Sequence, residues 1–151
     1  MNALELLKQD HQKVSDLFAK VEATDSEKQH EQLFEQIKTE LETHAHIEET
    51  VLYPALEKHE ELKDLVLEAY EEHKQVKTLI REIGRLADGS EKFDAKLKVM
   101  GENVEHHVEE EENEMFPKVR QFFSSQELEQ MGKELEAAKR EFRKTNQASA
   151  R

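Results

Sequence analysis

The chain has no cysteine, and it has only four glycines and two prolines among its 151 residues. Without cysteine there can be no disulfide, no iron–sulfur ligation and no thiol chemistry, which fits an expected cytoplasmic location. The few glycines and prolines leave little material for hairpin turns, and the β-branched and aromatic clusters typical of strands are also scarce. The composition therefore predicts an all-α fold.

Long apolar runs and an excess of positive charge are missing as well. No segment approaches the roughly 20 apolar residues that a membrane span requires, and the opening MNALELLKQDHQKV does not resemble a signal peptide. The formal net charge is −13, and a surface this acidic repels phosphate backbones. We therefore expect neither a membrane nor a nucleic acid as a partner, while the oligomeric state stays open.

Apolar residues recur three and four positions apart along five segments, which is the period of amphipathic helices. Four long stripes span residues 4–21, 34–55, 62–83 and 93–119, and a shorter stripe spans residues 128–138. Short connections between long helices favour antiparallel neighbours. We predict an antiparallel up-down-up-down four-helix bundle with an additional C-terminal helix.

The predicted organisation has three parts. The four-helix bundle occupies residues 1–122, the C-terminal helix residues 123–143 and a frayed tail residues 144–151. Pro54 and Pro117 are expected to kink or end their helices, because proline lacks an amide donor and crowds the preceding turn.

Local signals also mark helix starts and one break. Thr24 with Glu27, and Ser124 with Glu127, have the spacing of capping boxes at the start of a helix. Asp88-Gly89-Ser90 has the composition of a break between the third and fourth helices.

Ionisable residues interrupt all four long stripes, at positions where the periodicity requires apolar side chains. Burying such groups without partners costs on the order of several kcal/mol each, so they need strong partners. A bound cation can satisfy all of them together. The six residues are His11, His44, Glu48, His73, His107 and Glu111. Their distances from the predicted turns place the four histidines at one level near the middle of the bundle.

An internal repeat supplies these residues twice. Each half carries one lone histidine and one His-x3-Glu pair, and residues four apart share a helix face. A two-fold arrangement of the halves then offers two similar metal positions. Imidazole and carboxylate together suit iron or manganese more than calcium. With about six ligands per metal, bridging carboxylates and one bridging oxygen, roughly two of about twelve positions stay open for a small ligand.

Four motifs resemble the hemerythrin-like, or HHE cation-binding, family: DHQKV, HAHIEETVLYP, EHKQV and HHVEEEENEMFP. The resemblance implies a non-heme di-iron centre, two iron ions with a bridging oxygen, and the same ligands would accept manganese or zinc. It also implies oxygen, nitric oxide or peroxide as the small-molecule ligand. Transferred residue by residue, it assigns the six residues above as the metal ligands.

The sequence departs from the oxygen-carrying hemerythrins in two ways. Those proteins have a second histidine four residues after the one on the third helix, where this chain has Lys77. They also carry His-x4-Asp on the fourth helix, where this chain has His107-x3-Glu111. The missing fifth histidine leaves the centre more open, which favours sensing or redox chemistry over reversible oxygen carriage.

Two functions therefore fit, and the sequence does not separate them. The first is a di-iron protein that binds or senses oxygen or nitric oxide. The second is a di-iron oxidoreductase that consumes peroxide or nitric oxide, with iron storage or buffering as a further alternative. Enzymatic activity stays open, and no catalytic residue is assigned.

Several other residues have weaker claims to the centre. Glu49 and Glu112 follow the proposed glutamate ligands by one residue and are expected to be solvated, with hydrogen bonding to a ligand histidine as the alternative. Tyr53 and Tyr70 are expected to pack in the core rather than donate to a bound oxygen species. Lys77 is expected to be a snorkelling surface residue. The histidines expected to lie outside the centre are His30, His46, His59 and His106.

Overall fold

The computed structural model describes residues 1–86 and 90–149, and within these ranges every element is a helix. The elements are α1 (Ala3–Glu22), α2 (Glu27–Ile47), the π-helix η1 (Glu48–Leu52), α3 (Tyr53–Leu56), α4 (Glu60–Gly84), α5 (Glu91–Glu110), the π-helix η2 (Glu111–Met115), α6 (Phe116–Phe122) and α7 (Ser125–Ser149). The predicted all-α fold is confirmed. None of the described helices is long and apolar enough to cross a membrane.

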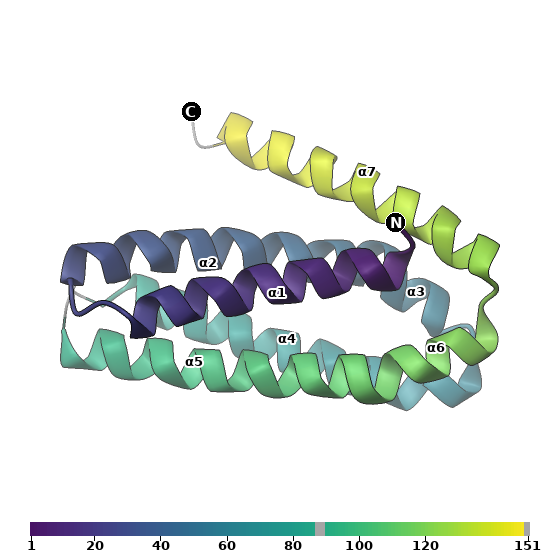
Figure 1. The fold of residues 1–151 in the computed structure, drawn as a ribbon, viewed down its shortest axis with the longest axis horizontal. Coiled ribbons are helices and arrows are strands. Elements are labelled where there is room, and N and C mark those ends of the chain that lie inside the picture. The colour runs from purple at the N-terminus through teal and green to yellow at the C-terminus, as the bar shows by residue number, and fades with distance from the viewer. Residues whose placement is uncertain (87–89, 150–151) are drawn as a thin grey trace.

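Four rods form the bundle, and they run side by side along the long axis of the molecule (Figure 1). They consist of α1, of α2 continued by η1 and α3, of α4, and of α5 continued by η2 and α6. Short connections make the rods alternate in direction, as predicted for an up-down-up-down bundle. Most of the expected break at Asp88-Gly89-Ser90 lies outside the described residues, and Ser90 caps α5 by accepting from the amide of Phe93.

Helix α7 folds back over α1 and α2 on the outside of the bundle (Figure 1). It runs to Ser149, so the helix continues past Lys144, where the sequence predicted a frayed tail. Within this stretch the hydroxyl of Thr145 donates to the carbonyl of Glu141. The division of the chain at residue 122 stays a prediction.

One of the two expected capping boxes is confirmed. The amide of Ser124 donates to Glu127 Oε1 at 2.9 Å, and the amide of Glu127 donates to Ser124 Oγ at 3.1 Å. The box predicted at Thr24 is wrong, because Ser26 caps α2 and accepts from the amide of Gln29 at 3.3 Å. Ser26 has the extended backbone conformation that an N-cap needs and directly precedes the first helical residue.

The two prolines lie inside helical segments and do not end them at once. Pro54 in α3 and Pro117 in α6 each follow a π-helical segment. The amide of Tyr53 donates to the carbonyl of Glu48, and the amide of Phe116 donates to that of Glu111, each five residues earlier. This wider turn lets the helical path continue past a residue that has no amide hydrogen. Both π-helices begin at a predicted metal ligand.

Two hydrophobic clusters fill the bundle, with a buried polar layer between them. On α1, for example, Leu7 belongs to one cluster and Val14 to the other, and His11 lies between them. On α4, Ala69 and Ile80 flank His73 in the same way. The buried polar residues are Asp10, His11, Thr43, His44, Glu48, His73, His107 and Glu111.

Candidate metal centre

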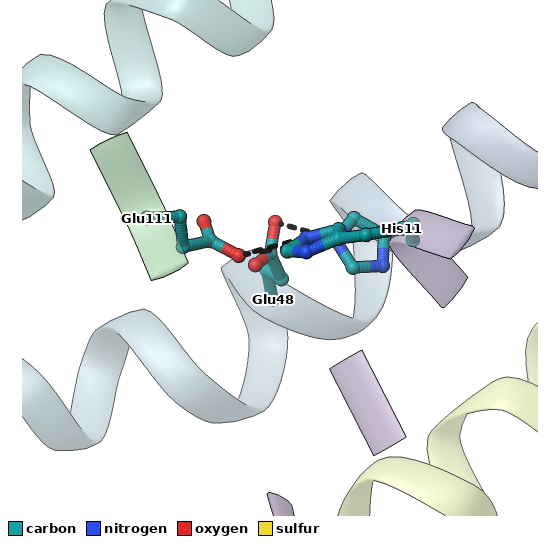
Figure 2. A group of neighbouring side chains, drawn as sticks. His11, Glu48 and Glu111 are labelled. Carbon is teal, nitrogen blue, oxygen red and sulfur yellow. Dashed lines mark hydrogen bonds and ion pairs between the residues drawn. The ribbon is translucent and has the colours of Figure 1, made fainter. Parts of the chain in front are cut away.

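The structure brings all six predicted residues together in this polar layer. His11 comes from α1, His44 from α2, His73 from α4 and His107 from α5, while the two glutamates begin η1 and η2. Every one of the six exposes 9% or less of its surface. Figure 2 shows the imidazole of His11 and the carboxylates of Glu48 and Glu111 pointing toward one another. The predicted depth of the site, midway along the bundle, is therefore observed.

The ligand atoms form two neighbouring groups. The first group consists of His11, His44, Glu48 and Glu111, and the second consists of Glu48, His73 and His107. Within each group the ligand atoms lie within 4.8 Å of one another. Because both groups include Glu48, the arrangement offers two adjacent cation positions that share a carboxylate.

Each glutamate contacts histidines from both halves of the repeat. Glu111 places Oε1 at 3.2 Å from His11 Nε2 and Oε2 at 3.3 Å from His107 Nε2. Glu48 Oε1 lies 3.2 Å from Nε2 of both His44 and His73. Both carboxylates thus lie between the two histidine pairs, His11 with His44 and His73 with His107.

Three buried atoms at the centre lack a hydrogen bond within the described part of the chain: Glu48 Oε2, His107 Nε2 and Glu111 Oε1. His107 Nε2 lies 3.3 Å from Glu111 Oε2 and Glu111 Oε1 lies 3.2 Å from His11 Nε2, but neither contact has the geometry of a hydrogen bond. Buried polar atoms in native proteins nearly always have a partner. Imidazole nitrogens and carboxylate oxygens are the donors that iron, manganese and zinc accept. The residues present therefore fit a bound metal.

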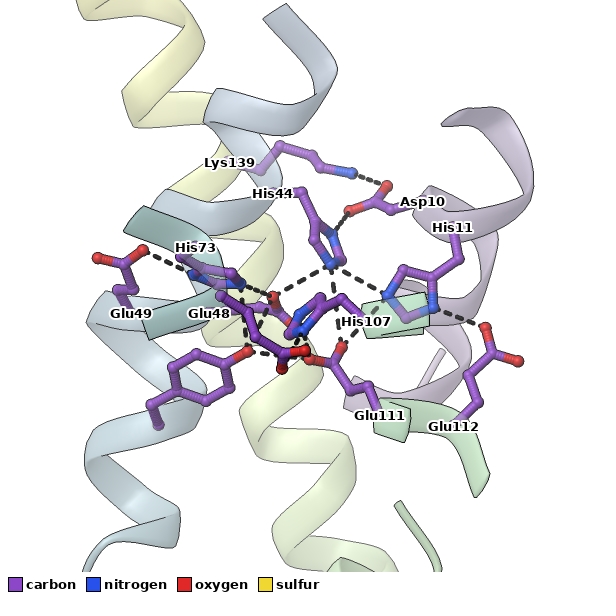
Figure 3. A network of polar contacts seen from close by, with 12 residues as sticks. Asp10, His11, His44, Glu48, Glu49, His73, His107, Glu111, Glu112 and Lys139 are labelled. Atoms are coloured by element: carbon purple, nitrogen blue, oxygen red, sulfur yellow. Dashed lines mark hydrogen bonds and ion pairs between the residues drawn. The ribbon is translucent and has the colours of Figure 1, made fainter. Parts of the chain in front are cut away.

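All four histidines donate Nδ1–H to a carboxylate outside the centre, so that Nε2 faces inward. Figure 3 labels the pairs His11–Glu112, His44–Asp10 and His73–Glu49. The distances are 2.6 Å from His11 to Glu112, 3.1 Å from His44 to Asp10, 2.7 Å from His73 to Glu49 and 3.0 Å from His107 to Glu72. Such partners set the tautomer and the orientation of metal-binding imidazoles. The four bonds link α1 to α2, η1 to α4, α4 to α5 and η2 to α1, which closes a ring around the bundle.

Two of these outer carboxylates correct an expectation from the sequence. Glu49 and Glu112 were expected to be solvated, but their side chains are only 24% and 30% exposed and each bonds a histidine. Asp10 and Glu72 were not predicted at all. Their one local signal is that each directly precedes a lone histidine, and each bonds the histidine of the following long helix instead.

Tyr53 packs in the core as expected, and its hydroxyl also reaches the centre. The side chain is fully buried, and the hydroxyl donates to Glu111 Oε2 at 2.9 Å and lies 3.2 Å from Glu48 Oε1. Burial raises the pKa of Tyr53 well above its ordinary value, and the charges of the two glutamates raise it further. At the equivalent position of the second half, Phe116 stacks on His11 without offering a hydroxyl. The two halves of the centre are therefore chemically different.

The protein alone holds protons where cations would bind. Burial alone would lower the pKa of His44, but the charge of Glu48 and hydrogen bonds to Asp10 and Glu48 outweigh it and raise the pKa to about 10. Burial alone would also lower the pKa of His107, but the charge of Glu111 at 3.3 Å and the hydrogen bond to Glu72 outweigh it and raise the pKa to about 11. Burial would raise the pKa of Glu111, yet hydrogen bonding to Glu48 and to the histidines holds it well below its ordinary value.

Lys77 does not point a free charge at the centre. Its ammonium donates to both oxygens of Glu49, at 3.0 and 3.2 Å, and Glu49 in turn holds His73. The side chain is 43% exposed, which agrees with the expected surface position.

The remaining histidines lie away from the centre, as expected. His30 bonds the carbonyls of Val21 and Thr24 at the turn between α1 and α2. His46 stacks on Phe142, and His59 packs against Phe122 and Phe123. His106 is exposed and forms a third, peripheral group of possible ligands with Glu72 and Glu110.

A small cavity of about 40 Å³ lies against the histidine side of the centre. All four histidines line it, together with apolar side chains that include Val14, Leu41, Val76, Ile80 and Val104. A water molecule needs roughly 10–15 Å³ measured in this way, so the space admits a molecule of two heavy atoms. The charged residues Asp10, Glu42 and Lys77 also line it.

A four-helix bundle with four inward-facing imidazoles and two shared carboxylates defines a cation-binding helical protein. The Hemerythrin HHE cation binding domain family matches residues 2–119 of the chain. The chain therefore belongs to this family. The match includes all six residues of the centre and ends before α7.

Two relatives add to this assignment. A DNA nickase of Nostoc sp. (strain PCC 7120) is 31% identical over 139 residues, which are 92% of this chain but only 39% of that protein. The chain thus spans well under half the length of this relative. A crystal structure of a hemerythrin HHE cation binding domain-containing protein from Mycobacterium kansasii is similar with a TM-score of 0.80 and 29% identity. That similarity covers 96% of this chain and 89% of the other.

Proposed function

We propose that the chain holds two iron ions between His11, His44, His73, His107, Glu48 and Glu111 and binds oxygen or nitric oxide beside them. The observation that carries the proposal is the convergence of four Nε2 atoms on two carboxylates that still have unpartnered oxygens. A bound iron pair would supply redox chemistry and open positions for an exogenous ligand.

The histidines and their outer carboxylates are preorganised for binding. Because Nδ1 of each ring is engaged, the lone pair of Nε2 is available only toward the centre. The hydroxyl of Tyr53 fixes one oxygen of Glu111 and lies close to Glu48, which orients both carboxylates. Little rearrangement is then needed when protons are exchanged for cations.

The cavity determines which ligand can approach. Its walls are mostly apolar and its volume is about 40 Å³, so it favours a small uncharged molecule over a bulky or charged one. These features suit oxygen or nitric oxide.

Consumption of peroxide is a second candidate, and Tyr53 favours it. Its raised pKa keeps the phenol protonated, and the hydroxyl lies 2.9 Å from a carboxylate of the centre. The chain therefore places a proton donor at the buried centre, which peroxide chemistry requires.

The name of the Nostoc relative raises DNA as a substrate. The formal net charge of −13 opposes it, because binding a phosphate backbone relies on lysine and arginine to displace counterions. We therefore propose no nucleic-acid substrate for this chain.

Metal analysis of protein purified without added metal tests the proposal. We expect about two iron ions per chain in the wild type and clearly fewer in His73→Ala, because that change removes a ligand from one position. Glu109→Gln, which alters an exposed residue of α5 that belongs to none of the candidate ligand groups, is the control and should match the wild type. A wild-type protein that retains no metal would contradict the proposal.

The ligand is identified by mixing reduced protein separately with oxygen, nitric oxide and peroxide and following the optical spectrum. A stable, reversible change with oxygen or nitric oxide supports ligand binding. Catalytic loss of peroxide supports the oxidoreductase, and many metal ions per chain without either response supports storage.

A further inference from the structure

Helix α7 reaches the metal centre through one side chain. Lys139 Nζ donates to Asp10 Oδ1 at 2.5 Å, and Asp10 Oδ2 accepts from His44 Nδ1 at 3.1 Å (Figure 3). The Nε2 atom of the same imidazole faces Glu48 at 3.2 Å. The side chains of Lys139, Asp10 and His44 are 18%, 9% and 9% exposed, so water screens this chain of bonds only weakly.

This connection has no counterpart in the second half of the repeat. Glu72 takes the place of Asp10 there and bonds His107, but no lysine bonds Glu72 among the described residues. Lys139 also lies outside residues 2–119, the part of the chain that matches the family. The connection therefore comes from a helix that lies outside the matched family domain.

Two kinds of contact hold α7 on the bundle. Its first half buries Leu128, Met131 and Leu135 in the hydrophobic cluster that also contains Tyr53. Its second half is held by the bond from Lys139, by Phe142 stacked on His46 with ring centroids 4.3 Å apart, and by Arg143 near Glu40 at 3.4 Å. The position of the second half therefore depends on contacts at the level of the metal centre.

We infer that Lys139 is a positioning residue of the centre, and that docking of the second half of α7 is coupled to occupation of the metal position at His44. The inference rests on the proposed metal binding. The ammonium of Lys139 keeps Asp10 turned inward, and Asp10 holds the ring of His44 with Nε2 toward the metal. Coupling between two sites is reciprocal, so a metal held by His44 also stabilises the docked helix.

The first test compares Lys139→Met with Lys133→Met, which changes an exposed lysine of α7 that has no ion-pair partner among the described residues. Anaerobic titration with Fe²⁺ against a competing chelator measures the affinity of each position. For Lys139→Met we expect about tenfold weaker binding of one of the two ions, the low end for residues that support a metal ligand. Lys133→Met should bind like the wild type, and Lys139→Arg should recover most of the loss, because arginine also pairs with carboxylates.

The second test needs no activity and reads α7 directly. Amide hydrogen exchange of residues 136–143 is measured in metal-free and Fe²⁺-loaded protein. Loading should slow exchange in the wild type and leave it unchanged in Lys139→Met. Circular dichroism of the metal-free variants checks that the bundle is folded, and Lys139→Gln carries the same expectation should the methionine variant fail this check.

The outcomes separate the inference from the proposed function. A wild type that binds no Fe²⁺ removes the proposed function and the inference together. A wild type that binds two ions, with Lys139→Met binding them equally well, overturns the inference alone. Phe142→Ala removes another contact of the same half of α7 but keeps the lysine, so we expect a smaller loss of affinity than in Lys139→Met. A loss as large as that of Lys139→Met would overturn the assignment of the coupling to Lys139.

Discussion

Each histidine of the centre uses both ring nitrogens, Nε2 toward the centre and Nδ1 toward an outer carboxylate. A carboxylate at Nδ1 makes the imidazole a stronger ligand and stops the ring from turning. Two of the four outer carboxylates, Asp10 and Glu49, are also bonded by lysines. The residues that shape the centre therefore include these outer carboxylates and lysines as well as the six candidate ligands.

Replacement of an outer carboxylate should weaken metal binding without unfolding the bundle. In Glu112→Gln the side chain keeps its shape but loses the charge that supports His11 Nδ1, which lies 2.6 Å away. We expect about 10- to 100-fold weaker metal binding, measured by chelator competition. Glu109→Gln, an exposed change on the same stretch of chain, is the control. Equal affinities for the two variants would show that Glu112 does not support the ligand.

At the scale of elements, the two π-helices connect the prolines to the centre. Each begins at a glutamate of the candidate centre and ends directly before the segment that contains the proline. A π-turn rotates the following residues relative to an α-helix. This rotation accompanies the placement of Tyr53 beside both carboxylates and of Phe116 on His11. The Tyr53-Pro54 and Phe116-Pro117 pairs therefore mark the points where a π-helix returns to an α-helix without a break in the rod.

Helix α7 depends on a close approach to the start of the chain at Gly132. A Cβ atom at this position would lie 2.4 Å from the carbonyl oxygen of Met1, which is backbone and cannot simply turn away. We expect Gly132→Ala to lower the free energy of unfolding by about 1–3 kcal/mol, as overpacking does. Urea denaturation followed by circular dichroism measures the change.

Gly84 provides the matched control for this prediction. A Cβ atom there would meet nothing within 4 Å, and the residue ends α4. Gly84→Ala should leave the stability unchanged or raise it by up to about 1 kcal/mol, because alanine is the better helix former. A Gly132→Ala protein as stable as Gly84→Ala would show that the N-terminus moves aside at no cost.

At the scale of the whole molecule, the metal-free bundle is stabilised by protons that its histidines hold. The pKa of His44 is about 10 and that of His107 about 11 in the folded chain, against about 6.5 in an unfolded chain. A raised folded pKa contributes stability that is complete below pH 6.5 and is lost as the pH rises through 10 to 11. The lowered pKa of Glu111 contributes stability with the opposite pH dependence: this contribution is present at neutral pH and is lost only in acid.

The urea concentration at the unfolding midpoint of chelator-treated protein should therefore decrease as the pH is raised from 6.5 to 10. In iron-loaded protein the metal replaces the protons at Nε2, so the midpoint should lie higher and change less over the same range. His106→Ala is a control for general effects of pH on an exposed histidine. A midpoint of the metal-free protein that rises toward pH 10 would contradict the proton-holding arrangement.

The sequence alone determined the helical class, the antiparallel bundle and the convergence of His11, His44, His73, His107, Glu48 and Glu111. These depend on periodicity: a stripe with a 3.6-residue period defines a buried face, and ionisable residues on that face have to meet inside. The repeat of one histidine and one His-x3-Glu pair indicated the same set of ligand types in each half of the bundle.

Only the tertiary structure decided which residues surround that set. Glu49 and Glu112 sit about 100° from the buried face, and from one helix alone that direction suits solvent as well as a neighbouring histidine. The bond from Lys139 to Asp10 joins residues at opposite ends of the chain and exists because α7 folds back over α1 and α2. Periodicity describes one helix and its core, whereas these contacts depend on the rotation and depth at which two helices pack.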